Sequence, residues 1–451
     1  MKRLIAPLSP LCDLWPLLHG CLLALPVAVA AGSASALFLW ALDQGTELHW
    51  QHPEWLWGLP VAGVLVGLLY QHFGKGAEKG NNLLIDEIHQ PGGGVPTRMA
   101  PMVLICTLIT HLFGGSAGRE GTAVQMGGSL AAGLARLFRV SEKNHRLMLM
   151  CGIAAGFGAV FGTPLTGAIF AMEVLVIGRI QYGALIPVLV ASVSGDATCT
   201  AWGIHHTVYH LEVPLSAGTH APFEAMLLLH VVMAGACFGL ASLFFSELTH
   251  RLQRGFVGLM PHAVWRPALG GLIIIAMTWM LGTRDYLGLG VEPPPGGMVS
   301  ITQSFEAGGA TTWSWLWKAL FTAVTLASGF KGGEVTPLFF IGSTLGHTLG
   351  LLLDEPVAMF AALGFIAVFA GAANTPLACT VMGIELFGAH YSVHFATACF
   401  VAYAFSGRSG IYLAQRIGVC KKSGQRLDSN ITLREVRDNA SIKKTTKDQS
   451  P

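Results

Sequence analysis

The sequence predicts an all-α integral membrane protein built from interrupted helices. Hydrophobic residues make up 52% of its 451 residues and charged residues only 12%, well below the roughly 25% charged residues of a soluble domain. Several apolar runs approach or reach the roughly 20 residues that cross a bilayer. The 56 glycines and 22 prolines interrupt these runs at many places, a pattern typical of transporters whose half-helices meet at a midplane ion site.

The apolar runs give the expected order of membrane helices. They cover residues 16–42, 56–72, 99–113, 183–203, 224–247, 264–282 and 337–353, with more between them. The first run is too long for a signal peptide and lacks a clear cleavage site, so we interpret it as the first membrane helix. The nine cysteines are scattered singly without a CxxC pair, which favours core packing over disulfides or a zinc ribbon.

The second half of the chain repeats the first. The tripeptide Thr-Pro-Leu at 163–165 is followed by Glu173, and the same tripeptide at 375–377 is followed at the same spacing by Glu385. The glycine-rich segment around Arg119 recurs in the same register in the second half. Two motifs in one register indicate a duplication. The symmetric positions of Glu173 and Glu385 indicate that both glutamates maintain the fold.

The repeat divides the chain into four parts. We expect a cytoplasmic N-terminus over 1–15, a first membrane repeat over 16–215, a second over 220–418, and a basic cytoplasmic tail over 419–451. Lys2 and Arg3 at one end and the basic tail at the other place both termini in the cytoplasm by the positive-inside rule.

Glu120 is the most informative residue, because it lies in a glycine-rich break between two apolar runs. The segment Gly118-Arg119-Glu120-Gly121-Thr122 leads into a run of small residues with helical character, so Glu120 is expected just before or within the first turn of a helix. Helix starts expose free N–H groups and attract anions. An ionisable side chain within the membrane is a functional hypothesis by default, since an unpaired buried charge costs more than helix capping contributes. One carboxylate at such a place can occupy an anion site and carry a proton.

Four glycine-bearing segments are expected as helix starts facing one place: 80–82, 118–122, 332–337 and 407–412. Together with the Thr-Pro-Leu repeat, they resemble the CLC family of chloride channels and proton-coupled anion antiporters over about 16–415. The resemblance implies the CLC fold, in which two inverted repeats of broken helices meet at a midplane anion site.

Within the family, the details resemble the fluoride/proton antiporter branch. GREGT replaces the commoner GREGP, GGEVTP replaces a phenylalanine-bearing segment, and Asn81 stands where chloride transporters have a serine. Chloride/proton exchangers often carry an inner proton-accepting glutamate where this chain has Val174. This departure puts the usual two-glutamate proton route in doubt and agrees with the fluoride branch.

The resemblance implies roles for individual residues. Glu120 matches the gating glutamate that alternates with the anion and carries the proton. Tyr412 matches the tyrosine whose hydroxyl donates to the anion, and Asn81 offers an amide. The remaining candidate anion-binding residues are Gly118, Arg119, Gly121, Val335 through its N–H, and Thr336 through its hydroxyl. Thr336 is also a candidate helix N-cap, with Pro337 at the first helical position.

Glu334 has no counterpart in the chloride transporters, although the fluoride branch carries a similar glutamate. We interpret it as a possible second proton group. The alternative is a structural salt bridge to Lys331 or Arg119, because buried carboxylates are usually paired.

The predicted function is proton-coupled fluoride export by an F⁻/H⁺ antiporter, in a bacterial inner membrane. The alternative is a chloride/proton exchanger or a passive chloride channel on the same fold. A remote alternative from another class is a membrane metallohydrolase, because His206 and His210 have helical zinc-ligand spacing beside His205 and Glu212. The expected partners are fluoride or chloride, protons, the lipid bilayer and a second copy in a homodimer. No enzyme activity, cofactor, metal or nucleic acid is expected.

Overall fold

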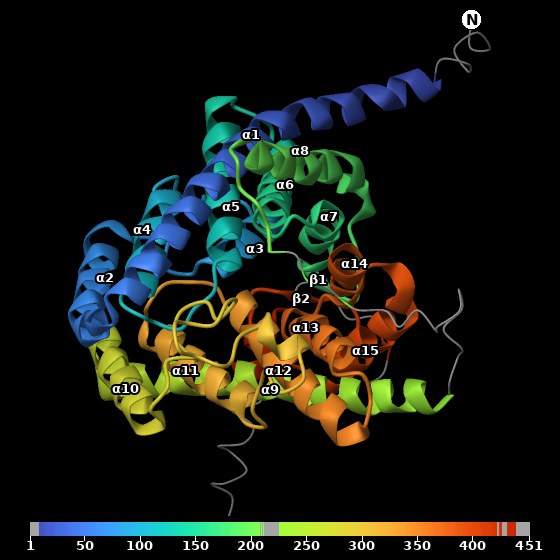
Figure 1. Cartoon of the computed structure of the whole chain (residues 1–451). Helices are drawn as coiled ribbons and strands as arrows, with labels where there is room; N and C mark the ends of the chain where they lie inside the picture. The colour runs from blue at the N-terminus through green and yellow to red at the C-terminus, as the bar shows by residue number, and fades with distance from the viewer. Residues whose placement is uncertain are drawn as a thin grey trace, which may run out of the picture.

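The computed structural model describes residues 9–207, 209, 211, 225–421, 424–425 and 431–438. These residues are mainly helical (Figure 1), which confirms the all-α prediction. The helices of the first half are α1 (Ser9–Gln51), α2 (Leu59–Phe73), α3 (Asn81–His89), α4 (Met99–Leu112), α5 (Glu120–Leu137), α6 (Glu142–Phe161), α7 (Pro164–Glu173) and α8 (Leu185–Ala201). Those of the second half are α9 (Ala225–Leu259), α10 (Arg266–Leu281), α11 (Ser314–Ser328), α12 (Val335–Leu353), α13 (Val357–Ala373), α14 (Pro376–Phe387) and α15 (Ser392–Phe405).

Short elements connect these helices. The 3₁₀ turns are Pro53–Gly58, Tyr182–Ala184, Gln303–Phe305 and Ala389–Tyr391. The strands β1 (Val176–Ile177) and β2 (Arg416–Ile417) form a two-residue parallel ladder. This ladder was not predictable from the sequence, because two-residue strands leave no periodic pattern.

Five helical stretches of the described chain are long and apolar enough to cross a membrane: residues 14–51, 53–73, 182–201, 225–259 and 335–353. The first helix exceeds the apolar run predicted for it at both ends. An apolar run marks the part of a helix that lies in hydrocarbon, and a helix can continue into the polar interface.

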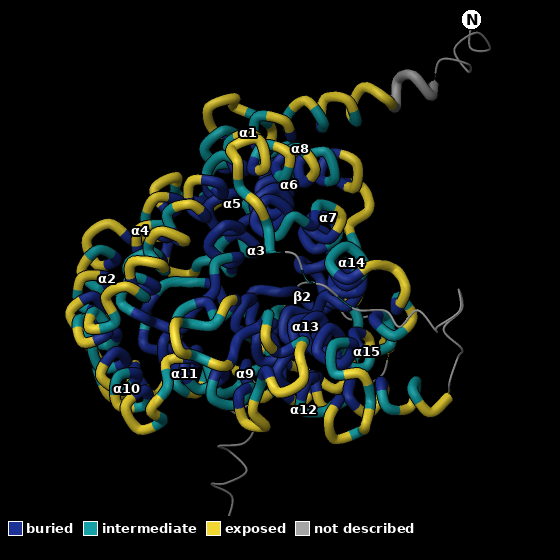
Figure 2. Tube along the Cα trace, viewed as in Figure 1, coloured by how far each residue is buried: buried dark blue, intermediate teal, exposed yellow. Residues whose placement is uncertain are grey.

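The two halves pack face to face, with α1 to α8 on one side and α9 to α15 on the other (Figure 1). Buried residues gather in the interior of both halves, whereas the outer helices α1, α2 and α9 expose much of their surface (Figure 2). At the centre, Gly118 and Gly333 form an antiparallel bridge. The N–H of each glycine donates to the carbonyl of the other at 2.7 Å. Such a reciprocal, antiparallel contact is what a two-fold axis between inverted repeats produces.

The repeated glutamates exchange helix caps between the halves. The carboxylate of Glu173 accepts hydrogen bonds from the N–H groups of Leu377 and Ala378 at 3.1 and 2.8 Å. Glu385 accepts from Leu165 and Thr166 at 2.9 and 2.8 Å. Each carboxylate therefore satisfies free N–H groups at the start of the opposite half's helix, α14 or α7. These contacts agree with the interpretation that both glutamates maintain the fold.

Replacing Glu173 with Ala is expected to destabilise the protein, because two N–H groups at the start of α14 lose their acceptor. A hydrogen bond to a charged group contributes about 1.5–3 kcal/mol, so the midpoint of thermal unfolding in detergent should fall measurably. Glu306→Ala, at an exposed loop position, is the matched control and should leave the midpoint unchanged. Equal midpoints for the two variants would contradict the structural role of Glu173.

Candidate functional site

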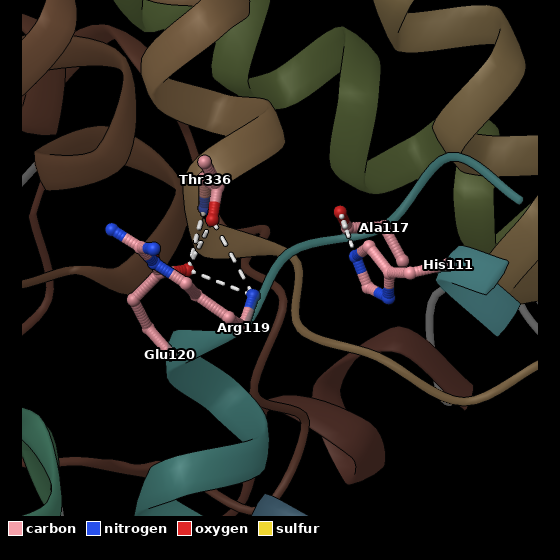
Figure 3. Close-up of polar contacts among 5 residues, drawn as sticks. All are labelled: His111, Ala117, Arg119, Glu120 and Thr336. Carbon is pink, nitrogen blue, oxygen red and sulfur yellow. Dashed lines mark hydrogen bonds and ion pairs between the residues drawn. The ribbon is translucent and has the colours of Figure 1, made fainter. Parts of the chain in front are cut away.

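Glu120 lies where two helix N-termini meet at the interface of the halves. It is the first residue of α5 and is 1% exposed. Its Oε2 accepts hydrogen bonds from the Thr336 N–H at 3.0 Å and from the Thr336 hydroxyl (Figure 3). The N–H of Arg119 also donates to this oxygen, at 3.3 Å. The carboxylate of one half therefore occupies the anion-attracting start of α12 in the other half.

Arg119 provides the positive charge closest to this carboxylate. Its Nε lies 3.6 Å from Glu120 Oε1, and its side chain is 15% exposed. The exposed part lines a cavity of about 290 Å³, whose wall also includes His111 and Arg284. The arginine that pairs with Glu120 thus lines this cavity, which we call the Arg119 cavity.

Two glycines allow the segment before α5 and the segment before α12 to approach each other. A Cβ on Gly118 would stand 2.9 Å from Thr336 Oγ1, and a Cβ on Gly333 would stand 2.8 Å from the backbone nitrogen of Gly121. Both distances are too short for a side chain. The hydrogen bonds between Glu120 and Thr336 therefore depend on glycine at these positions.

A second cavity is larger and has a volume of about 470 Å³. Its wall includes Asn81, Glu334 and Tyr412, and we call it the Tyr412 cavity. Asn81 Nδ2 and Glu334 Oε2 lie 3.2 and 3.6 Å from the point where a Cβ of Gly121 would stand. The structure therefore brings three candidates from separate parts of the chain to one cavity. Two of them, Asn81 and Glu334, lie beside Gly121, the residue that follows Glu120.

Glu334 is the N-cap residue of α12, but its side chain makes no capping hydrogen bond. No ion pair joins it to Lys331 or Arg119, all of which lie in the described chain. Lys331 places its ammonium 4.0 Å from the centre of the Tyr70 ring, and Arg119 pairs with Glu120. The salt bridge of Glu334 with Lys331 or Arg119, expected as the alternative, is therefore not formed. Glu334 lines the Tyr412 cavity instead.

Two local predictions need correction. Tyr412 does not begin a helix: α15 ends at Phe405, and residues 406–415 form turns and irregular backbone. The N–H of Ala414 donates instead to Asn82 Oδ1, at 2.8 Å. Thr336 is not an N-cap either, because α12 begins at Val335. Pro337 is the third residue of that helix, and the Thr336 hydroxyl binds Glu120 across the interface.

Three residues around the site were not among the candidates predicted from the sequence. Asn82 holds the backbone next to Tyr412, Gln125 lines the Tyr412 cavity, and His111 places its Nε2 2.9 Å from the carbonyl oxygen of Ala117, in the linker before Glu120 (Figure 3). Gln125 was recognisable in principle, since it follows Gly121 by four residues and shares its helix face. Asn82 and His111 left no comparable signal.

The histidine cluster does not provide a metal site in the described residues, where no group of three or more candidate ligands occurs. His206 Nε2 lies 3.5 Å from Asp196 Oδ1 on α8. His210 and Glu212 of the predicted cluster lie outside the described residues.

This arrangement defines a class of membrane transport protein in which two inverted repeats place a buried glutamate between helix N-termini. The family model described as voltage gated chloride channel matches residues 62–407. The chain therefore belongs to the CLC family of channels and transporters, which are integral membrane proteins and not enzymes.

Individual relatives agree with this assignment. A protein named chloride/fluoride channel protein from Pseudomonas syringae pv. tomato is 51% identical over 88% of this chain and 86% of its own length. The crystal structure of a CLC-type fluoride/proton antiporter is 33% identical and superposes with a TM-score of 0.84, covering 89% of this chain and 99% of the other. A slow cyanobacterial Cl⁻/H⁺ antiporter is 20% identical with a TM-score of 0.68, covering 86% and 94%, and shares the fold.

Proposed function

We propose that the chain is a proton-coupled fluoride exporter in which Glu120 alternates with the anion. The observation that carries the proposal is the position of the Glu120 carboxylate, which accepts the N–H and hydroxyl of Thr336 at the start of α12. A negatively charged oxygen held by directed donors is a stand-in for a small anion at the same place.

Fluoride is small and strongly hydrated, so its site must replace water with several directed donors. Thr336 supplies two such donors when Glu120 leaves. Val335, the first residue of α12, has an N–H at the same helix start. The Asn81 amide and the Tyr412 hydroxyl line the cavity through which the anion arrives. None of these donors is a cation, which favours release of the anion during turnover.

Protonation of Glu120 couples the anion to the proton. The charged carboxylate competes with fluoride for the donors on Thr336. Once protonated, it loses that competition and its attraction to Arg119 weakens. An inward proton gradient then drives fluoride out, because the anion and the deprotonated carboxylate exclude each other. Glu334 is proposed as the second proton group, since it faces the Tyr412 cavity without an ion pair.

The membrane location, the oligomeric state, the repeat boundaries and the orientation of the protein are proposed from the family resemblance and the charge distribution. We place the protein in a bacterial inner membrane as a homodimer with one pore per subunit. The repeat boundaries are those expected from the duplication, at 16–215 and 220–418, and both termini are assigned to the cytoplasm. The Tyr412 cavity then opens to the cytoplasm, because Arg434 of the basic tail lines it.

The test is anion efflux from proteoliposomes loaded with fluoride or chloride, recorded with ion-selective electrodes while external pH is followed. Fluoride is expected to leave rapidly with protons moving in the opposite direction, and chloride to lag far behind. Equal or faster chloride movement would overturn the selectivity argument for Asn81 and Thr336. A chloride/proton exchanger or a passive channel would then become the leading function.

A further inference from the structure

The segment that carries Tyr412 is held by contacts from several directions. We call residues 411–418 the tyrosine segment. From the first half, Asn82 Oδ1 accepts from the N–H of Ala414 at 2.8 Å. Gln415 of the segment donates through Nε2 to the carbonyls of Val174 and Ala373 at 2.9 and 2.7 Å. Within the segment the structure gives one turn hydrogen bond, from the N–H of Gln415 to the carbonyl of Tyr412 at 3.2 Å. Contacts with other segments therefore set the position of Tyr412.

A further set of contacts comes from the end of the described chain. Residues 431–438, which we call the tail turn, return to lie along the tyrosine segment. The N–H of Leu433 donates to the carbonyl of Gln415 at 3.0 Å, and that of Arg434 donates to the carbonyl of Leu413 at 3.0 Å. In return, the N–H of Ile417 donates to the carbonyl of Ile431 at 2.9 Å. Leu433 is only 2% exposed and packs in an apolar cluster with Ile417.

The tail turn also has its own helix start. The Thr432 hydroxyl accepts from the N–H of Glu435 at 3.2 Å, and the Glu435 carboxylate accepts from the N–H of Thr432 at 2.8 Å. This reciprocal pair is a capping box. The backbone donor on Thr432 also lowers the pKa of Glu435. The turn is therefore a formed element next to the site.

Glu247 connects the tail turn to the glycine break before Tyr412. This glutamate lies on α9, and its Oε2 is 3.0 Å from Arg437 Nη2 of the tail turn. Its Oε1 accepts from the Ser409 hydroxyl at 3.0 Å. The Glu247 carboxylate thus joins Ser409, which precedes Tyr412, to Arg437 of the tail turn. Arg434, also in the tail turn, lines the Tyr412 cavity.

We propose that the tail turn and Glu247 form a clamp that positions Tyr412 for the anion. The clamp rests on the proposed function, because it acts through the anion site. Glu247 and Arg437 are positioning residues, because neither of them lines the Tyr412 cavity. Loosening the clamp should raise the anion concentration needed for half-maximal transport. Proton transfer at Glu120 should be spared, since the hydrogen bonds and ion pairs that the structure gives Glu247 go to Ser409, Arg437 and Arg251, and none of these lies on α5 or at the start of α12.

The test compares Arg437→Gln, Glu247→Gln and the double variant in proteoliposomes, with initial efflux measured as a function of internal anion concentration. We expect a several-fold rise in KM for each single variant, a smaller change in kcat, and unchanged proton-to-anion stoichiometry. The double variant should resemble the single variants, because two partners of one interaction are not additive. Arg251→Gln is the matched control: it removes a cation 3.8 Å from the same carboxylate, but from an exposed side chain on α9.

A second measurement does not depend on transport. Hydrogen exchange of the 411–418 backbone should accelerate in Arg437→Gln and stay unchanged in Arg251→Gln. An unaltered KM together with unaltered exchange would overturn the clamp. So would a loss of kcat alone with a lowered melting temperature, since that indicates general destabilisation. If the parent protein moves chloride and not fluoride, the proposed function fails, while the clamp is judged by the KM for chloride.

Discussion

Glu120→Gln is expected to abolish the coupling of anion movement to protons. The amide cannot release a proton, and it carries no negative charge that would compete with fluoride for the donors on Thr336. The variant should behave like a permanently protonated transporter and let fluoride run down its own gradient. In proteoliposomes, fluoride efflux should continue while external pH no longer responds, and an imposed pH gradient should no longer drive fluoride uphill.

Loss of proton coupling is expected only when the carboxylate lies at the buried position of Glu120. Glu142 is a matched control, because it is also the first residue of a helix, α6, but is exposed. Glu142→Gln should keep coupled exchange at the parent rate. Persistent proton movement at the parent stoichiometry in Glu120→Gln would remove Glu120 from the proton route, and another carboxylate would have to carry the proton.

The start of α5 at Glu120 was predictable from the sequence, because a glycine-rich break before small residues is a local pattern. The break at 407–412 looked similar, yet no helix begins there. The difference lies in partners far away in sequence. The N–H of Ala414 has Asn82 as its acceptor, and that of Arg416 has the carbonyl of Leu175 at 3.2 Å. Sequence patterns report local preference and do not contain such long-range acceptors.

Glu173 and Glu385 also have partners that local sequence patterns do not contain. Their symmetry indicated a structural role, but not that each caps a helix of the opposite repeat. Symmetry is visible in the sequence because it is a matter of register. The exchange of caps is a matter of packing, which appears only when the two halves are brought together. The clamp formed by Glu247 and Arg437 is equally non-local, since these residues are 190 positions apart.

Glu334→Gln is expected to slow coupled exchange strongly without making fluoride movement independent of protons. Glu334 precedes Thr336, the residue that holds Glu120, by two positions and faces the Tyr412 cavity. If protons reach Glu120 through this carboxylate, its amide interrupts the route while the gating carboxylate remains. A positioned proton-transfer group contributes roughly 10²–10⁴-fold to a rate, so a fall in the coupled rate of about tenfold or more is expected.

Glu78→Gln is the control, because Glu78 lines the same cavity but is exposed on the loop before α3. It should leave the coupled rate near that of the parent, and Glu334→Asp should recover part of the rate by restoring a titratable group. The two carboxylate variants separate two roles. Glu120→Gln changes the stoichiometry, whereas Glu334→Gln changes the rate at fixed stoichiometry. A Glu334→Gln protein that exchanges fluoride for protons at the parent rate would assign Glu334 to the structure of the α12 start, and protons would then have to reach Glu120 along another path.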